Sequence, residues 1–175
     1  GADVPVLTNI NFTAEPGSVT AFIGSTGSGK TTLVNLIPRF YDVTTGAILI
    51  DGIDIRKLRM KDLRSQIGYI PQKGVLFSGT VKSNITYGKG DKPVNEKMMK
   101  KSAEIAMATE FIEKLPKGYD SEISQGGSNI SGGQKQRLSI ARALYMKPKI
   151  YIFDDSFSAL YYKTDRKLRT ALFKS

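Results

Sequence analysis

Residues 24–31 read Gly24-Ser25-Thr26-Gly27-Ser28-Gly29-Lys30-Thr31 and fill the pattern G-x-x-x-x-G-K-[ST] at every fixed position. The run before them, residues 19–23, is apolar and β-prone, and residues 32–37 space their apolar side chains as a buried helix does. A strand, a glycine-rich loop and a helix, in this order, are the context in which the motif binds phosphate. The segment therefore predicts a phosphate-binding loop, with a glycine-rich turn that binds no ligand as the alternative.

Each part of this loop matches a charged part of a nucleoside triphosphate bound with Mg²⁺. The glycines let successive backbone N–H groups and the helix N-terminus converge on the phosphates. The ammonium group of Lys30 reaches the β- and γ-phosphates, and the hydroxyl of Thr31 is a ligand for Mg²⁺. The predicted nucleotide-binding residues of this segment are Gly24, Ser25, Thr26, Gly27, Ser28, Gly29, Lys30, Thr31 and Thr32.

Composition limits the chemistry that the chain can carry. Its 175 residues are 40% hydrophobic and 24% charged, which is typical of one globular domain. It has no cysteine and no histidine, which excludes disulfides, thiolate metal sites and Ser-His or Cys-His catalysis, so acid–base chemistry must use carboxylates. The net charge of +10 is spread along the chain, so we expect solvated helix faces and no specific nucleic-acid partner. No apolar run approaches the roughly 18 residues of a membrane span, which predicts a soluble chain.

Hydrophobic patterning predicts an α/β fold. Strands are predicted at residues 7–12, 19–23, 47–50, 67–70 and 150–153, with a tight turn at Asp51-Gly52. Helices are predicted at residues 81–85, 95–107, 110–115, 132–146 and 163–173, besides the one that follows the phosphate-binding loop and ends near Pro38. The mostly helical stretch from about Lys73 to Met146 is an inserted region between strands.

Two further motifs carry chemistry. Asp154 directly follows the apolar strand at residues 150–153. In P-loop enzymes, a carboxylate at the end of such a strand holds Mg²⁺ through water. The segment Asn129-Ile130-Ser131-Gly132-Gly133-Gln134-Lys135-Gln136-Arg137 opens a strong helix with a serine and two glycines. A serine hydroxyl, close backbone approach and the helix dipole make a second anion-binding site there. A simple serine N-cap at the end of a loop is the alternative.

Together the three motifs closely resemble the ATP-binding domain of ABC transporters, from Leu7 to the end of the chain. The resemblance implies that residues 24–31 are the Walker A loop, Gln72 the Q-loop glutamine and residues 150–154 the Walker B strand. Asp155 takes the catalytic-carboxylate position, and the signature motif is Ser131-Gly132-Gly133-Gln134. The implied fold is a P-loop NTPase, with a mostly parallel core sheet and an antiparallel β region formed by residues 1–72 and 147–175, and a helical subdomain at about 73–146.

The resemblance also implies a function and partners. ATP and Mg²⁺ are the expected cofactors, with Thr31, Gln72 and Asp154 organising the metal. Two such domains face each other head to tail, so that Ser131 and Gly133 contact the γ-phosphate held by the partner. Residues 76–81, 84–85 and 87–88 resemble the exporter branch, which implies a transmembrane domain and a place at the cytoplasmic face of the cell membrane.

The chain departs from the family pattern at several points. Asp155 stands where hydrolytic subunits usually carry Glu, and the shorter side chain predicts slow hydrolysis. This resembles the degenerate half of heterodimeric bacterial multidrug exporters and implies a non-identical partner. Tyr161 stands where the D-loop normally has Asp, for which we have no physical reason. The family's adenine-stacking aromatic residue and switch histidine have no counterpart here, so the chain is expected to be a fragment lacking its first and last strands.

Two other functions fit parts of the pattern. A soluble ATPase of DNA repair or chromosome maintenance shares the Walker and signature motifs, and the positive charge favours it. In such proteins long coiled coils usually separate the two motifs, whereas Lys30 and Ser131 are close in this sequence. A non-hydrolysing ATP-sensing module would fit Asp155 and Tyr161. The spacing favours the transporter domain.

Overall fold

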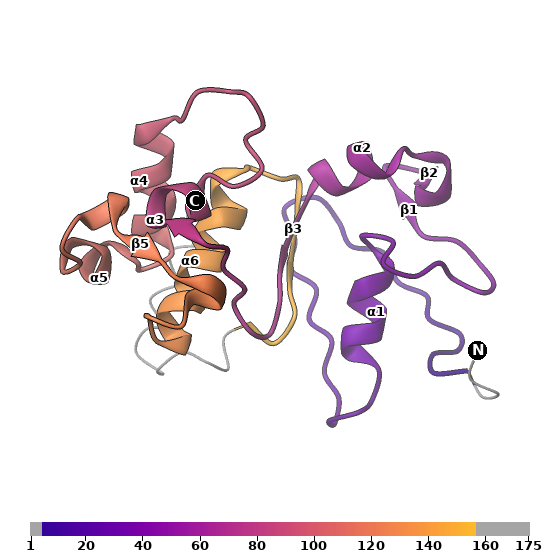
Figure 1. The fold of residues 1–175 in the computed structure, drawn as a ribbon. Helices are drawn as coiled ribbons and strands as arrows, with labels where there is room; N and C mark the ends of the chain where they lie inside the picture. The colour runs from indigo at the N-terminus through magenta and orange to yellow at the C-terminus, as the bar shows by residue number, and fades with distance from the viewer. Residues whose placement is uncertain (1–4, 157–175) are drawn as a thin grey trace. The chain divides into compact units, whose positions relative to one another are not determined.

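The computed structural model describes residues 5–156, so the helix predicted at residues 163–173 and the D-loop position Tyr161 lie outside the described part. The chain divides into two compact units, Gly1–Arg64 and Ser65–Ser175, which are described separately below. Figure 1 labels most of the helices and strands of both units.

The first unit carries the phosphate-binding loop and a small hairpin. Helix α1 spans Lys30–Leu36, strands β1 and β2 span Leu49–Ile50 and Ile53–Asp54, the 3-10 helix η1 spans Ile55–Lys57, and α2 spans Met60–Ser65 at the boundary. The two strands pair antiparallel, and Asp51 and Gly52 between them have φ of 52° and 78°. Two left-handed residues in succession are what a two-residue type I′ hairpin requires. The predicted turn is therefore confirmed, although the strand before it is shorter than residues 47–50.

The strands predicted at residues 7–12 and 19–23 are wrong. Both segments lie in loops, and the ring of Phe12 packs edge to face on Phe22 with 5.1 Å between centroids. Val19 and Ile23 are 69% and 96% exposed. An apolar segment becomes a strand only when its backbone groups pair with a neighbouring strand. Neither segment has such a partner in the part of the chain that the structure describes.

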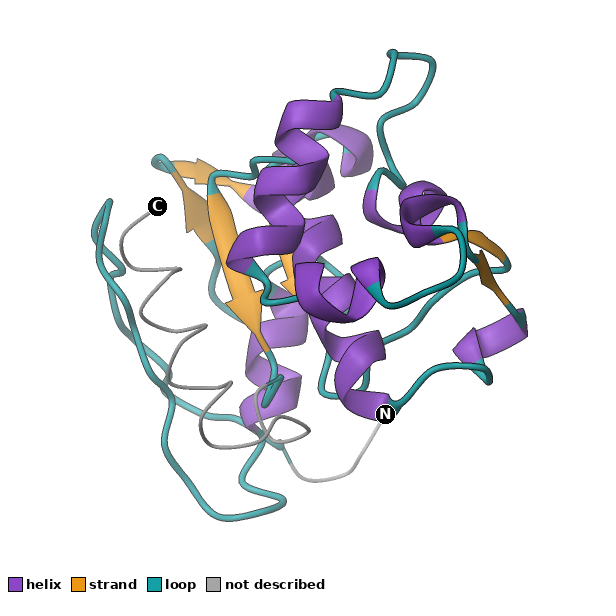
Figure 2. Ribbon diagram, turned by 90° about the vertical axis from the view of Figure 1, so that its left-hand side faces the viewer, coloured by secondary structure: helices purple, strands orange, loops and turns teal. Residues whose placement is uncertain are grey.

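The second unit contains the parallel strand pair that the sequence predicts. Strands β3 (Ile67–Ile70) and β6 (Ile150–Phe153) lie side by side in register, from Ile67 opposite Ile150 to Ile70 opposite Phe153 (Figure 1; Figure 2). Ile70 and Ile152 are buried. Both strands end at the bounds that the sequence predicts. Because parallel strands end at the same edge, the residues that follow Ile70 and Phe153 meet there.

Helices make up most of the remainder of this unit. They are α3 (Val81–Ile85), α4 (Glu96–Ile105), α5 (Thr109–Glu113) and α6 (Gly132–Tyr145), together with the 3-10 helices η2 (Gly118–Asp120) and η3 (Gln125–Gly127). Strands β4 (Gly79–Thr80) and β5 (Glu122–Ile123) pair antiparallel. All four predicted helices are present, and α4, α5 and α6 are shorter than predicted. Left-handed residues, Met107 and Lys147, follow the ends of α4 and α6.

The core of the second unit forms around α6, which packs against α3, α4 and β3. Leu138, Ile140 and Ala141 of this helix are fully buried. They pack in one cluster with residues of α3 and α4 such as Ile85 and Met99. Burial of this face holds the N-terminus of α6 in a fixed place in the unit.

Candidate functional site

Glycines shape the predicted phosphate-binding loop. Gly27 and Gly29 have φ of 82° and 88°, which are left-handed values that favour glycine. A Cβ atom at Gly24 would lie 2.5 Å from Oγ of Ser28, so a larger residue there would require the Ser28 side chain to move. Gly29 is the N-cap of α1, so the chain passes from the loop directly into the helix at Lys30. The sequence predicts a strand, a loop and a helix in this order. The loop and the helix are present, and the strand at residues 19–23 is not.

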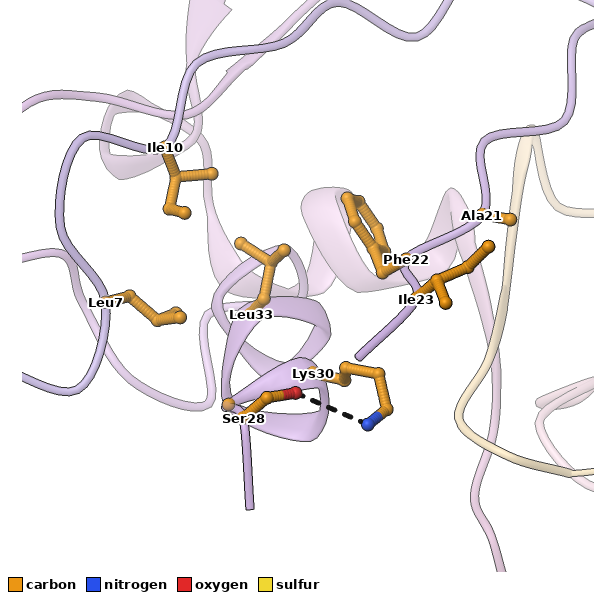
Figure 3. A pocket seen from close by; sticks show the side chains of 9 residues that line it. Leu7, Ile10, Ala21, Phe22, Ile23, Ser28, Lys30 and Leu33 are labelled. Carbon is orange, nitrogen blue, oxygen red and sulfur yellow. Dashed lines mark hydrogen bonds between the residues drawn. The ribbon is translucent and has the colours of Figure 1, made fainter. Parts of the chain in front are cut away.

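Lys30 folds back over the loop. Its Nζ donates hydrogen bonds of 2.7 Å to the carbonyl oxygens of Gly24 and Ser25, and one of 3.4 Å to Oγ of Ser28. Figure 3 shows the bond to Ser28. The ammonium group is thus held at the loop that leads into α1. A cation at this place fits an anionic phosphate group.

A cavity of about 290 Å³ lies beside this loop within the first unit (Figure 3). It has an apolar wall and a polar end. The lining residues are Leu7, Ile10, Ala21, Phe22, Ile23, Ser28, Gly29, Lys30 and Leu33. Ser28 and Lys30 line the same cavity, so its polar end coincides with the phosphate-binding loop.

In the second unit, Asp154 is held at the end of the paired strands. Its backbone N–H donates to the carbonyl of Ile70 at 3.0 Å, and the hydroxyl of Tyr69 donates to its Oδ2 at 3.1 Å. Burial raises the pKa of Tyr69, and the nearby charge of Asp154 and this hydrogen bond raise it further. The hydroxyl therefore stays protonated and remains a donor to the carboxylate. Sequence analysis did not identify Tyr69, because its partner lies 85 positions away.

Asp155 contacts the predicted Q-loop glutamine. Nε2 of Gln72 donates a hydrogen bond of 3.0 Å to Oδ2 of Asp155. Asp155 has a φ of 47°, a left-handed value that Asp adopts more readily than most residues. The buried hydroxyl of Ser156 then donates to the carbonyl of Ile70 at 2.5 Å. The structure therefore brings Gln72, Asp154 and Asp155 together at one edge of the β3–β6 pair.

The predicted signature segment begins α6 with a capping box. Oγ of Ser131 accepts a hydrogen bond from the backbone N–H of Gln134 at 3.2 Å, and Oε1 of Gln134 accepts one from the N–H of Ser131 at 2.9 Å. The serine N-cap that was the alternative interpretation is thus present. Ser131 and Gly132 are exposed, and a Cβ atom on Gly132 would meet nothing within 4 Å. A cap leaves the start of the helix accessible, so it does not oppose anion binding there.

The predicted site residues fall into both units. Residues 24–32 lie in Gly1–Arg64, and Gln72, Ser131–Gln134, Asp154 and Asp155 lie in Ser65–Ser175. Gly133 is half-buried at the start of α6.

Comparison with known proteins identifies the family to which the chain belongs. The family model described as ABC transporter matches residues 7–158. The chain belongs to the ABC transporter family. Its fold class, the α/β P-loop ATP-binding domain, is therefore confirmed, as is its class as an ABC-type ATPase domain.

Individual ABC relatives are similar over almost the whole chain. An uncharacterized ABC transporter ATP-binding protein of Mycobacterium tuberculosis is 53% identical over 98% of this chain and 29% of its own length. An ATP-dependent lipid A-core flippase of Syntrophus aciditrophicus is 50% identical over 97% of the chain and 28% of its own. A putative multidrug export ATP-binding/permease protein of Staphylococcus aureus is 46% identical over 97% of this chain and 29% of its own length. The chain thus spans less than a third of the length of these relatives.

A solved structure agrees with the ABC assignment. A bacterial Atm1-family ABC exporter with ATP bound superposes with a TM-score of 0.79 at 40% identity, over 85% of this chain and 26% of that one. Within residues 5–156, no helix is long and apolar enough to cross a membrane.

Proposed function

We propose that this chain is the ATP-binding and ATP-hydrolysing domain of an ABC exporter, which couples both steps to export of a substrate by a separate transmembrane domain. The observation that carries the proposal is the Gln72–Asp155 hydrogen bond of 3.0 Å. It joins the Q-loop position to the catalytic-carboxylate position beside Asp154. The export and flippase names of the relatives support the same function.

Each predicted residue has a role in this function. Lys30 and the amides of residues 24–32 hold the phosphates of ATP. Thr31, Gln72 and Asp154 would hold Mg²⁺, directly or through water, and the metal would supply positive charge that neutralises the phosphates. The side chains present fit this metal, since Mg²⁺ prefers hydroxyl, amide and carboxylate oxygens. Asp155 orients the attacking water.

The signature segment acts on the nucleotide of a partner. Ser131 and Gly133 contact the γ-phosphate bound by a second ABC domain that faces this one head to tail, and Gly132 and Gln134 shape the approach. Ser131 uses its oxygen as an acceptor within the cap, so its hydroxyl proton stays available for a phosphate. The exposure of Ser131 and Gly132 supports this role.

We infer that the chain's own ATP site hydrolyses slowly and that the partner is a non-identical domain. Compared with Glu, Asp155 lacks one methylene, which shortens its reach by about 1.5 Å. A general base needs to lie about 2.6–3.2 Å from the proton that it accepts, so this loss matters. The hydrogen bond from Gln72 further restrains the carboxylate.

The proposal includes an organisation and a location. The core consists of residues 1–72 and 147–175, and the helical subdomain of about 73–146. The assembled transporter places the domain at the cytoplasmic face of the cell membrane.

The test is Mg²⁺-dependent ATP hydrolysis by the complete protein that contains this chain. With the partner's own site inactivated, Asp154→Asn should strongly lower the slow hydrolysis that remains, and Asp120→Asn, which alters an exposed carboxylate in η2, should leave it unchanged. Equal effects of the two substitutions would argue against the assignment. A DNA-repair ATPase would instead bind duplex DNA with a sequence preference at about 0.15 M salt, where nonspecific phosphate contacts are weak. We expect no such binding.

A further inference from the structure

Gln136 is a fully buried amide in α6, with 0% of its surface exposed. Amide side chains are mostly exposed in proteins, because burial removes their hydrogen bonds with water. The residue lies in the second turn of the helix that begins at the Ser131 cap. Its burial therefore raises the question of which group it binds.

The partner of Gln136 is the backbone just before the Q-loop glutamine. Nε2 of Gln136 donates a hydrogen bond of 3.0 Å to the carbonyl oxygen of Pro71, which directly precedes Gln72. Oε1 of Gln136 accepts no hydrogen bond within the described residues. A buried amide oxygen without a hydrogen-bond partner lowers the stability of the fold. The hydrogen bond from Nε2 to Pro71 is therefore the contact that suggests a role for this residue.

Gly74 provides a second, independent contact between the same segments. A Cβ atom on Gly74 would lie 2.6 Å from the carbonyl carbon of Lys135 and 2.7 Å from the backbone nitrogen of Gln136. These are backbone atoms of a buried helix, so they cannot move aside as a flexible side chain would. Only glycine lets the chain after Gln72 lie directly on α6.

Arg142 extends the contact along the helix. Its Nη1 donates to the carbonyl of Val75 at 2.9 Å, and its Nε donates to the carbonyl of Asn84 at 2.8 Å. The backbone on both sides of Gln72 is therefore bound to one helix, at Pro71 before it and at Gly74 and Val75 after it.

We propose that Gln136 is a positioning residue which, together with Gly74, fixes the Gln72 segment to the signature helix. The contact with α6 thereby holds Gln72 in the place from which it donates its hydrogen bond to Asp155. The proposal rests on the function proposed above, because it takes Gln72 and the start of α6 to be two motifs of that function. It assigns the fixed distance between them to Gln136.

Two substitutions test this contact in the complete protein. Gln136→Met keeps a side chain of similar volume and removes the donor to Pro71, while Gly74→Ala keeps the donor and forces the backbones apart. Ser139→Ala is the matched control, since it removes from the same helix a buried hydroxyl that has no hydrogen-bond partner among residues 5–156. A nitroxide label at Lys73→Cys, an exposed position, reports the mobility of the segment. This chain has no cysteine of its own, and any cysteine elsewhere in the complete protein is replaced.

Both test variants should mobilise the label. With the partner's own site inactivated, they should lower kcat for ATP at this chain's site by about ten- to a hundredfold, as expected for misplaced catalytic groups. The KM for ATP should stay unchanged, because the phosphate-binding loop is untouched, and Ser139→Ala should change neither quantity. Gly74→Ala decides the matter if Gln136→Met does not fold. An immobile label in both variants would overturn the positioning role, whatever the change in kcat. If the unmutated protein neither binds nor hydrolyses ATP, the proposed function fails, and the label still tests the contact by itself.

Discussion

The side-chain amide of Gln72 donates a hydrogen bond of 3.0 Å to Asp155, 83 positions later in the chain. Each residue lies just beyond the end of its strand, and the parallel register places Ile70 opposite Phe153. The strand pairing therefore brings a polar amide and a carboxylate together without any local sequence signal. A substitution of either residue is expected to alter the position of the other.

Lys30 is predicted to be the main side-chain determinant of nucleotide binding. Lys30→Ala removes the cation held by the loop carbonyls and should weaken Mg-ATP binding at least about tenfold. Lys97→Ala, on the exposed face of α4, is the matched control and should bind as the unmutated protein does. Titration with a fluorescent ATP analogue measures both. Equal losses would show that general positive charge, rather than the loop, holds the nucleotide.

Ser131 should contribute both to stability and to hydrolysis. Ser131→Ala removes the N-cap of α6 and should lower the free energy of unfolding by about 1 kcal/mol. Thr80→Ala removes the equivalent capping box of α3 and should cost a similar amount. Only Ser131→Ala should also slow ATP turnover at the site shared with the partner domain. Similar turnover in the two variants, measured at matched stability, would leave Ser131 as a cap only.

The sequence predicts those elements whose local pattern is strong. Strands β3 and β6 are short apolar runs with clear stops at Pro71 and Asp154, so their bounds are predicted correctly. Residues 7–12 and 19–23 have a similar apolar pattern but are not strands. Pattern specifies which side chains prefer burial, whereas a strand also requires a partner, and a local pattern does not supply one.

The candidate site shows the same division. The glycines and Lys30 are found from their fixed spacing, and the Ser131–Gln134 capping box could have been found from its S-x-x-Q spacing. Tyr69 and Gln136 are missed because each binds a group far away in the chain. A polar residue at a core position of the predicted α6 is a sign of such a contact, but it does not name the partner.

Stability should fall at alkaline pH. Burial raises the folded-state pKa of Tyr69, Tyr119 and Tyr151, so the folded protein holds these protons more strongly than the unfolded chain. Their stabilisation is complete below the ordinary pKa of about 10 and is lost as pH rises through the raised folded values. The Tm should therefore decrease above about pH 10, and less steeply in Tyr69→Phe.

Thermal unfolding followed by circular dichroism at a series of pH values measures this effect. Tyr41→Phe, which removes the hydroxyl of an exposed tyrosine, is the matched control. The chain has no histidine, so no histidine titration contributes between about pH 5 and 8. The same slope in Tyr69→Phe and Tyr41→Phe would contradict a special contribution from Tyr69.

Asp155→Glu should raise ATP turnover at the chain's own site, because it restores the methylene that the carboxylate lacks. A gain of about tenfold is expected, at the low end of what general acid–base catalysis supplies. Two factors limit it. Glu adopts the left-handed backbone of this position, with φ of 47°, less readily than Asp, at a cost of about 1 kcal/mol. In addition, Tyr161 stands at the D-loop position, and Asp155→Glu does not change it.

The measurement is site-resolved single-turnover hydrolysis in the complete assembled protein, with the partner's own site inactivated by mutation. Asp155→Asn is the matched control: it keeps the size of the side chain, removes the charge and should lower the residual turnover. Gln72 donates a hydrogen bond of 3.0 Å to the carboxylate. Combining Gln72→Ala with Asp155→Glu therefore separates the effect of side-chain length from the effect of this hydrogen bond. A further gain in the double variant would assign part of the defect to the restraint by Gln72. Unchanged turnover in Asp155→Glu would rule out short reach as the cause, and fast turnover in the unmutated chain would refute the slow-site proposal itself.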